Sequence, residues 1–401
     1  MRILVLVHTW NAVDIINAAL DAILQQTAPV EEILIVDNAS TDGTAELKYP
    51  KIVTLTRHER NLGTSGSVKS GIEYARAHGY DWLWVLDADS LPQANALELL
   101  IHLAQDDGLS DDGPIGVVCS SHNLVRLGQT LHGRMLTPGG PRLPRLRAGY
   151  NHFDCDRVIW SGALINLAVV EQIGLPRVGT RGCWEDLSLD YGDTEYTYRI
   201  HRAGYKIFVH LESLLDHPLG KGLHRRILGW DFYTSNHSAF RRYLHFRNLV
   251  FFWLRIYHRR NWPVLLIWFG HRLSVMLARI IVLESDRGPK LKACLVGVLD
   301  GLRGRLDEHD PEKWKLTNAL RLCTEVMLEQ QARARWRFDL KPSLQLAREK
   351  SYPSQFVAPT QDRLPPRLIF AIPADGFLKT GLEGFGCAPA QLGFNFDGSM
   401  A

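Results

Sequence analysis

The chain has 401 residues, of which 46% are hydrophobic and 22% are charged, and its formal net charge is +3. This composition is ordinary for a globular protein and excludes a wholly disordered chain. Because the length exceeds what one hydrophobic core usually holds, we expect one large domain with an appended region, or two domains.

Positive charge is concentrated in one block of the chain. The segment from Lys221 to Arg305 contains 16 Lys and Arg residues against 4 Asp and Glu residues, so the rest of the chain is net acidic. Such a block can face nucleic acid, an anionic membrane surface or a polyanionic substrate.

The cysteines and the N-terminus indicate the compartment. The six cysteines form no Cys-x-x-Cys pair, which favours reduced, mostly buried thiols. The apolar run from Arg2 to Val7 is too short for a secretory signal and is followed at once by polar residues. We therefore expect a first strand there, in a cytoplasmic protein.

The first half of the chain alternates between strand-like and helix-like segments. The apolar pattern predicts strands at 3–7, 32–36, 52–55, 82–86, 115–120, 157–166 and 206–210. It predicts helices at 14–26, 68–77 and 97–104 and from 193 to Gly204, helical character at 163–173, and a long surface loop at 128–149. This alternation is typical of βαβ units and a mainly parallel sheet.

Two carboxylates follow the most apolar of these strands. Asp87 and Asp89 come directly after the run from Trp82 to Leu86, and Pro92 prevents that strand from continuing. Open α/β sheets bind ligands at the carboxyl ends of their strands, and two hard oxygen donors there suit a divalent cation that bridges phosphates. The alternative is a pair of solvated turn residues that cap the next helix.

Two further polar runs lie at the ends of expected elements. Asp37 to Thr44 follows the second strand, where Asp, Asn, Ser and Gly are also the ordinary residues of a loop. Asn61 to Ser67 leads into a helix, and its backbone donors and the positive end of the helix dipole suit a phosphate. It is not a P-loop, because the Gly-x-x-x-x-Gly-Lys-Ser/Thr spacing is absent.

A second acidic cluster precedes the last expected strand. Asp193 begins a helical pattern, where it can cap the helix, and Glu195 stands four residues before Arg199, an order that stabilises a helix. A capping role does not exclude catalysis. His217 lies beyond the next strand, and a His taken alone is more often a packed or solvent-exposed residue than a ligand.

In order, these motifs resemble those of family 2 glycosyltransferases with the GT-A fold. The matching segments are 7–11, 35–44, 61–63, 86–89, 161–162, 190–195 with Arg199, 204–205 and His217. The resemblance extends toward the rhamnosyltransferase branch through 190–195, 217–220, Arg242-Tyr243 and Arg247-Asn248. It implies an α/β fold with a Rossmann-like mixed sheet flanked by helices, followed here by a C-terminal amphipathic helical region.

The resemblance implies a role for each matching residue. Those expected to hold the nucleoside are Thr9, Trp10, Asn11 and Asp37, with Trp10 stacking on the base. Asp87 would contact the sugar nucleotide, while Asp89 and His217 would bind a divalent metal, Mg²⁺ or Mn²⁺, that neutralises the departing diphosphate. Asp193 would deprotonate the acceptor hydroxyl for one direct, inverting displacement.

Two positions depart from the family pattern. Lys69 stands where the family usually has Asn, after the small-residue run that contains Gly63, and this indicates an added phosphate contact or a different donor. Trp184-Glu185-Asp186 imitates the catalytic motif of other branches. The family places an Arg six residues after its base, and this spacing leads from Asp193 to Arg199 but from Asp186 to a glycine, so Asp186 is the alternative base.

The basic block contains two amphipathic stretches, 241–255 and 262–283, in which Arg alternates with aromatic and aliphatic residues. The longest strictly apolar run, Pro263 to Gly270, has eight residues, which is too short to span a bilayer. The block is therefore either a set of interfacial helices on an anionic membrane or a helical subdomain packed on the core. Nucleic-acid binding is disfavoured because no recognised motif is present.

The sequence thus predicts a catalytic domain at 1–220, a basic amphipathic helical region at 221–305, and a charged helix with an irregular tail at 306–401. We expect a peripheral enzyme of the inner membrane face that transfers a sugar, foremost rhamnose from dTDP-rhamnose, to a cell-surface glycan or lipid-linked acceptor. The alternatives are a UDP- or GDP-sugar donor and a catalytically silent glycan-binding or scaffolding homologue. A nucleotidylyltransferase is disfavoured, because its Gly-x-Gly-Thr-Arg loop is missing.

Overall fold

The structure is a computed structural model. It describes residues 1–109, 113–124, 128–130, 133–137, 140–144, 146, 149–183, 185–217, 223–227, 230–257 and 262–307. The charged helix expected at 311–335, the irregular tail and Trp184 lie outside these residues. The described residues up to Leu223 and from Thr234 onward belong to one compact unit, and His224–Tyr233 belong to a second.

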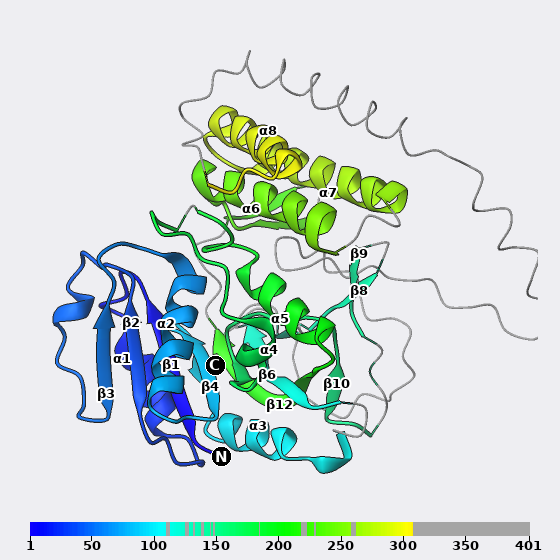
Figure 1. Cartoon of the computed structure of the whole chain (residues 1–401). Helices are drawn as coiled ribbons and strands as arrows, with labels where there is room; N and C mark the ends of the chain where they lie inside the picture. Colours follow the sequence, from blue (N-terminus) through cyan, green and yellow to red (C-terminus); the bar gives the residue numbers. More distant parts are fainter. Residues whose placement is uncertain are drawn as a thin grey trace, which may run out of the picture. The chain divides into compact units, whose positions relative to one another are not determined.

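The first unit is built on a mixed sheet of ten described strands (Figure 1). Its main path runs β10-β12-β6-β11-β4-β1-β2-β3, with β5 paired to β12 and β7 paired to β6. The strands are β1 (Ile3–Thr9), β2 (Ile33–Asp37), β3 (Val53–Arg57), β4 (Trp82–Asp87), β5 (Leu91–Pro92), β6 (Ile115–Leu124), β7 (Gly128–Thr130), β10 (His152–Asp154), β11 (Ala163–Asn166) and β12 (Lys206–His217).

The strands β1 to β4 form the parallel part that the sequence predicts. β1 pairs in parallel with β2 and β4, and the register sets Thr9 beside Asp37 and His8 beside Asp87. The carboxyl ends of these strands therefore meet at one edge. β11 runs antiparallel between β4 and β6, which makes the sheet mixed, as expected.

Helices cover the two faces of the sheet and enclose separate cores. On one face lie α1 (Ile16–Leu24) and α3 (Ala96–Ala104), which bury their apolar stripes against the strands. On the other lie α2 (Gly63–Ala77), α4 (Val169–Ile173) and α5 (Gly192–Arg202). α2 begins five residues earlier than predicted, because the small residues that look like a loop form its first turn.

The predicted surface loop at 128–149 is partly wrong. It contains β7 and a small antiparallel pair formed by β8 (Met135–Thr137) and β9 (Gly140–Arg142). Strands of three residues are too short to show an alternating pattern, so the Gly and Pro content dominated the prediction. Another unpredicted pair, β13 (Leu223–Ile227) with β14 (Trp230–Thr234), belongs to the second unit except for its terminal residues Leu223 and Thr234.

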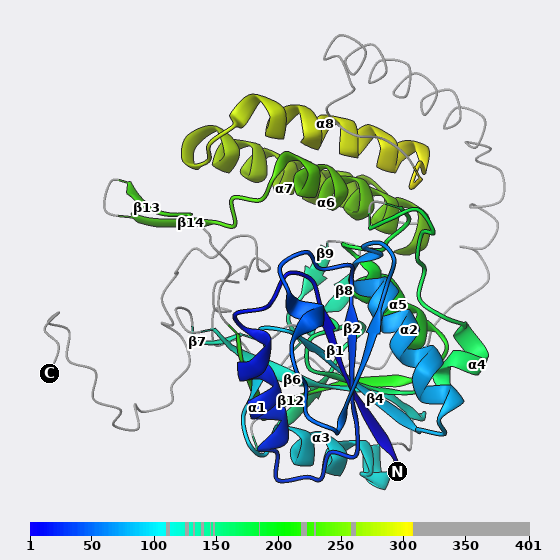
Figure 2. The same cartoon turned by 90° about the vertical axis from the view of Figure 1, so that its left-hand side faces the viewer.

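The basic block folds into three helices of the first unit. These are α6 (Ala239–Phe251), which continues as a π-helical segment at Phe252–Tyr257, α7 (Trp262–Leu283) and α8 (Arg287–Arg303). α6 and α8 lie side by side (Figure 2). Two apolar clusters join the helices, one around Phe246, Leu249 and Ile280 and the other around Leu244 and Val296.

Several charges of this block are buried and paired. Arg242 and Arg247 are 1% and 0% exposed. The Nη2 atom of Arg242 lies 2.5 Å from Oε1 of Glu284, and the Nζ atom of Lys290 lies 3.1 Å from the other carboxylate oxygen. Around α6 the expectation of arginines facing lipid is therefore corrected in favour of the packed subdomain, because buried carboxylates and carbonyls supply their partners.

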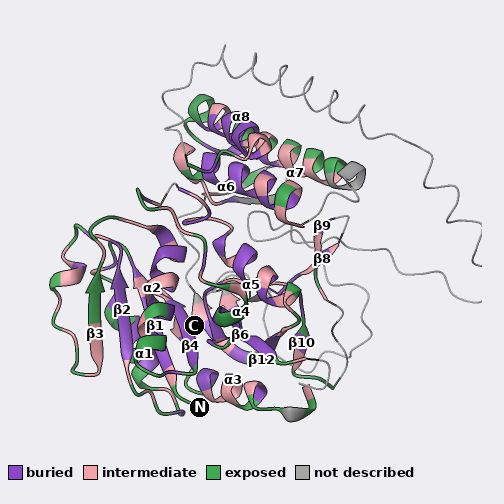
Figure 3. Cartoon of the chain, viewed as in Figure 1, coloured by how far each residue is buried: buried purple, intermediate pink, exposed green. Residues whose placement is uncertain are grey.

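Helix α7 is different, because one side of it is exposed (Figure 3). Among its exposed side chains, Leu266 and Ile267 lie near its start and Ile281 and Val282 near its end. Leu266–Leu283 has a mean hydropathy of 1.6, and length and composition alone would allow it to cross a membrane. From the sequence, a membrane-spanning helix is excluded because the longest strictly apolar run has eight residues. That exclusion is wrong, because one or two polar residues do not end an apolar helix.

The charge cluster around Glu284 generates a stability prediction. Glu284→Ala leaves Arg242 and Lys290 buried without their shared carboxylate, and breaking such a buried pair costs about 3–5 kcal/mol. Urea unfolding followed by circular dichroism should show this loss. Glu59→Ala is the matched control, because Glu59 has a 93% exposed side chain, and it should change the free energy of unfolding by less than about 0.5 kcal/mol. Equal stability of both variants would contradict the buried pairing.

Candidate active site

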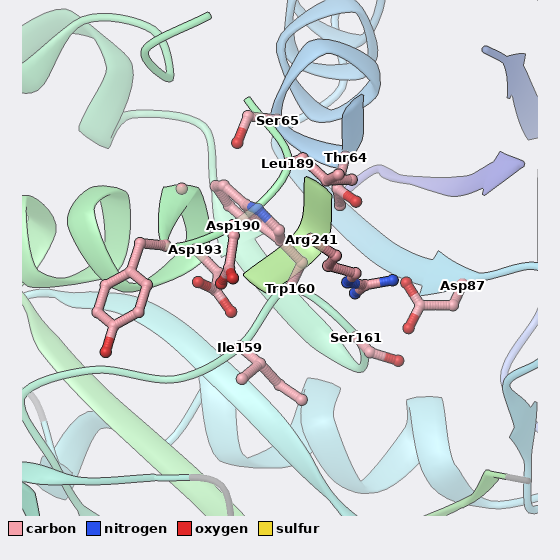
Figure 4. A pocket seen from close by; sticks show the side chains of 12 residues that line it. Thr64, Ser65, Asp87, Ile159, Trp160, Ser161, Leu189, Asp190, Asp193 and Arg241 are labelled. Atoms are coloured by element: carbon pink, nitrogen blue, oxygen red, sulfur yellow. The ribbon is translucent and has the colours of Figure 1, made fainter. Parts of the chain in front are cut away.

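A cavity of about 220 Å³ opens at the carboxyl end of β4 (Figure 4). Asp87, the last residue of β4, and Asp193, in the first turn of α5, both line it. The structure therefore brings together the two carboxylates to which the sequence argument gives the donor and the base. The lining residues are Thr64, Ser65, Asp87, Ile159, Trp160, Ser161, Leu189, Asp190, Tyr191, Gly192, Asp193 and Arg241.

The first turn of α2 is one support of this cavity. The amide of Ser65 donates to the carbonyl of Ser188 over 2.9 Å, and its hydroxyl donates to the carbonyl of Leu187 over 3.0 Å. A Cβ at Gly63, where φ is +71°, would lie 2.4 Å from the oxygen of Ser188. The small residues thus admit the segment before α5, and the Ser65 amide, a donor expected to serve a phosphate, is already used.

The other support is α6. Its Arg247 donates through Nη2 to the carbonyl of Asp186 over 2.7 Å, and Asn248 donates through Nδ2 to the carbonyl of Asp190 over 2.6 Å. The Nδ1 atom of His245 lies 3.0 Å from the Asp190 carboxylate. Sequence reasoning matched Arg247-Asn248 to a family motif without a role, and the structure shows that this pair holds the segment that carries Asp193.

The environment of Asp193 alters its acidity. Its side chain is half-buried, and Oδ1 accepts a hydrogen bond of 2.6 Å from the amide of Thr194. Burial raises the pKa of Asp193 to about 6, the charge of Arg157 and the Thr194 bond oppose the rise, and the neighbouring Asp190 adds to it. A carboxylate of that pKa is ionised at neutral pH and is basic enough to accept a proton during a reaction.

Asp186, the alternative base, lies elsewhere. Its carboxylate accepts two hydrogen bonds from Nε of Arg177, at 3.0 and 3.2 Å, and its amide donates to the carbonyl of Leu306. It is absent from the described lining of the cavity, whereas Asp193 belongs to it. The geometry therefore favours Asp193, in agreement with the spacing to Arg199.

The acidic turn after β4 has side chains that suit a divalent metal. Asp87 contacts Nε2 of His8, and Asp89 is half-buried two residues further on. β12 ends at His217, and because Asp216 pairs with Leu91, the backbone of His217 continues toward this turn. Hard carboxylate oxygens with a neighbouring imidazole suit Mg²⁺ or Mn²⁺. No described group of three side chains forms a metal site, and the side chain of His217 lies outside those described.

The residues expected at the nucleoside meet at the ends of β1 and β2. Thr9 is buried, and its hydroxyl has no hydrogen-bond partner among the described residues. Trp10 is 57% exposed, which leaves a face for stacking. Asn11 accepts a bond of 2.8 Å from the amide of Thr41. None of these residues is among the described residues that line the cavity, and their nucleoside roles stay a prediction.

Asp37 and Lys69 are the remaining residues expected to bind the donor. Asp37 is fully buried, and its carboxylate accepts hydrogen bonds from the amide and hydroxyl of Ser40 and lies 3.4 Å from Nε of Arg57. It therefore orders the loop after β2, whatever else it binds. Lys69 lies one turn beyond Ser65 on α2 and is not among the described residues that line the cavity, so its phosphate contact stays a prediction.

Part of the chain is similar to known proteins. Residues 4–160 match the model of glycosyl transferase family 2. The galactofuranosyltransferase GlfT1 of Mycolicibacterium smegmatis is 27% identical over 247 residues, which cover 57% of this chain and 75% of the relative. The undecaprenyl-phosphate mannosyltransferase of Micrococcus luteus is 25% identical over 234 residues, which cover 55% of this chain and 86% of the relative.

A solved structure supports the fold. S. aureus TarS 1–349 in complex with UDP-GlcNAc matches with a TM-score of 0.50 and 13% identity, over 76% of this chain and 81% of that chain. At this identity the likeness shows the fold alone, and the expected GT-A fold is confirmed. The rhamnosyltransferase branch is not shown, because the named relatives transfer galactofuranose and mannose.

The raised pKa of Asp193 predicts a pH-dependent stability. A carboxyl group whose pKa rises from 3.8 to about 6 on folding binds its proton more tightly in the native state, so stability falls as the pH rises from about 4 to 6. Asp193→Asn should therefore melt at a higher temperature than the wild type above pH 6, and this advantage should vanish near pH 4. Thermal denaturation across this range measures it.

Asp186→Asn is the control for this experiment, since it loses an ion pair with Arg177 and removes no buried unpaired charge. It should not be more stable than the wild type at any pH in the range. An Asp193→Asn variant without a stability gain above pH 6 would contradict the burial of that carboxylate.

Proposed function

We propose that this protein is a family 2 glycosyltransferase, an inverting, metal-dependent enzyme that transfers a sugar from a nucleoside diphosphate sugar to a hydroxyl of a glycan or lipid-linked acceptor. The observation that carries the proposal is the single cavity lined by both Asp87 and Asp193. One carboxylate lies at the strand end where α/β folds bind nucleotides, and the other has the pKa of a general base.

Asp193 is the proposed base. It accepts the proton of the acceptor hydroxyl through its carboxylate, the hydroxyl oxygen attacks the anomeric carbon, and the bond to the donor diphosphate breaks. Because one displacement suffices, one base suffices, and the configuration inverts. The hydrogen bond from Thr194 orients the carboxylate, and the bonds from Asn248 and Ser65 hold its segment in place.

Asp87, Asp89 and His217 are the proposed residues at the diphosphate. Asp87 contacts the sugar nucleotide, while Asp89 and His217 hold Mg²⁺ or Mn²⁺. When bound, the cation neutralises charge that develops on the leaving diphosphate. The other proposed donor contacts are Thr9, Trp10, Asn11 and Asp37 at the nucleoside and Gly63 and Lys69 at the phosphates.

The donor sugar is a finer proposal. The motifs at 190–195 and 217–220 favour rhamnose from dTDP-rhamnose. The relatives named above transfer galactofuranose and mannose, so these sugars are the second candidates.

We also propose that the enzyme works on the inner face of an anionic membrane, with α7 as the contact. Leu266, Ile267, Ile281 and Val282 leave an apolar surface in water. The opposite side of α7 buries Met276 and Ile280 against α6. A helix with one side packed on protein suits an interfacial position better than a spanning one, in which every side would meet lipid or another helix.

A transfer assay tests the enzymatic proposal. We expect nucleotide-sugar hydrolysis or transfer in a screen of UDP, GDP and dTDP sugars that includes rhamnose, galactofuranose and mannose. Asp193→Asn should reduce the rate by about 10²- to 10⁴-fold, as loss of a general base does. The rate of the wild type should fall as the pH drops through about 6, where Asp193 becomes protonated.

Two controls accompany this assay. Asp186→Asn should keep most of the activity, and excess EDTA should abolish it until Mg²⁺ or Mn²⁺ is restored. An active Asp193→Asn with an inactive Asp186→Asn would transfer the base role to Asp186. Full activity in EDTA would refute the metal, and no turnover of any donor would support a silent homologue.

Liposome flotation tests the membrane contact. The double variant Ile267→Glu with Ile281→Glu should float with anionic vesicles at least about 10-fold less than the wild type, because each buried isoleucine contributes about 1.5–3 kcal/mol. Binding should also weaken as salt rises. Leu24→Glu, at a 43% exposed apolar position on α1, is the matched control and should float normally. Wild-type protein that stays in the membrane after alkaline carbonate extraction would contradict a peripheral attachment.

A further inference from the structure

The described lining of the cavity carries more negative than positive side chains, although the ligand that we propose is an anion. Its described lining contains three carboxylates, from Asp87, Asp190 and Asp193, and one cationic side chain, that of Arg241. A nucleoside diphosphate sugar carries about two negative charges. The carboxylates repel these charges unless cations lie between the carboxylates and the diphosphate. Arg241 is therefore the described residue of this cavity whose charge complements a diphosphate.

The position of Arg241 follows from the way α6 packs. Ser238 caps the helix, and its hydroxyl accepts a bond of 3.3 Å from the amide of Arg241. The next two residues turn inward, Arg242 to Glu284 and Tyr243 to Asp300, at 2.5 and 3.0 Å. With those two side chains fixed in the interior, the helical rotation leaves Arg241 on the side of the cavity.

The side chain of Arg241 is available to a ligand. Arg241 is exposed, in contrast to Arg242 and Arg247, which are buried and hydrogen-bonded. In Figure 4 its guanidinium points toward the Asp87 side of the cavity. No carboxylate of the described residues is paired with it, so its five donors are open to phosphate oxygens.

We infer that Arg241 binds the diphosphate of the sugar nucleotide and stabilises it as the leaving group, an inference that rests on the proposed function. A guanidinium presents two parallel N–H donors to a phosphate, which a lysine cannot do. The helical region then has a direct part in the reaction, since α6 supplies a cation opposite the strand that carries Asp87. The same chemistry would suit a diphosphate on a lipid-linked acceptor, and the test separates the two sources.

Binding measurements by calorimetry test the inference without turnover. UDP, GDP and dTDP are titrated into the wild type with Mg²⁺ present. The nucleoside of the best ligand is titrated in parallel, and so is farnesyl diphosphate, which represents a lipid-linked acceptor. Arg241→Gln should weaken the nucleoside diphosphate about 10- to 100-fold, which is the usual loss for a charged hydrogen bond to phosphate. Affinity for the nucleoside should not change, and Arg241→Lys should recover part of the loss.

Arg60→Gln is the matched control, because Arg60 has a 55% exposed side chain and is not among the described residues that line the cavity, and it should bind all ligands as the wild type does. Unchanged diphosphate affinity in Arg241→Gln overturns the inference, and so does a loss confined to farnesyl diphosphate, which would assign Arg241 to the acceptor. A wild type that binds none of the three nucleotides overturns the proposed function, and the inference with it.

Discussion

The active-site arrangement depends on hydrogen bonds that satisfy the buried carbonyls of one irregular segment, 186–190. This segment is neither a helix nor a strand, so regular backbone pairing does not supply donors for its carbonyls. A buried carbonyl without a donor costs about 1–3 kcal/mol. Ser65 and its amide supply donors from α2, and Arg247 and Asn248 supply them from α6. Because Asp193 follows directly, the same bonds that stabilise the segment fix the proposed base relative to Asp87.

The parts of the fold that the sequence predicted share a physical cause. The parallel strands are continuous apolar runs buried on both faces, and such runs are visible in a single sequence. The pattern placed Asp87 and Asp193 at the ends of elements, and the resemblance of the motif order to a family supplied their proposed roles. The α2 start was missed, since Gly63 and Ser65 resemble a loop until the segment that packs on them is known. The short strands β7 to β10 were missed because they are held by pairing and not by pattern.

The basic block shows where local patterns stop being informative. Alternation of arginine with aromatic residues is equally typical of a helix on a membrane and of a helix packed on protein. The two cases differ in the partner of each charge. The partner of Arg242 is Glu284, which is 42 residues away in the sequence. Likewise the contrast between Arg241, which faces the cavity, and Arg242, which is buried, depends on helical rotation that only packing decides.

The segment before α5 also has a mechanical consequence. It is hydrogen-bonded on one side to the first turn of α2 and on the other side to α6. The segment therefore links the domain that contains the sheet to the helical region. Neither side can shift against the other without breaking hydrogen bonds to buried carbonyls. A displacement of α2 relative to α6 would therefore also displace the segment that precedes Asp193.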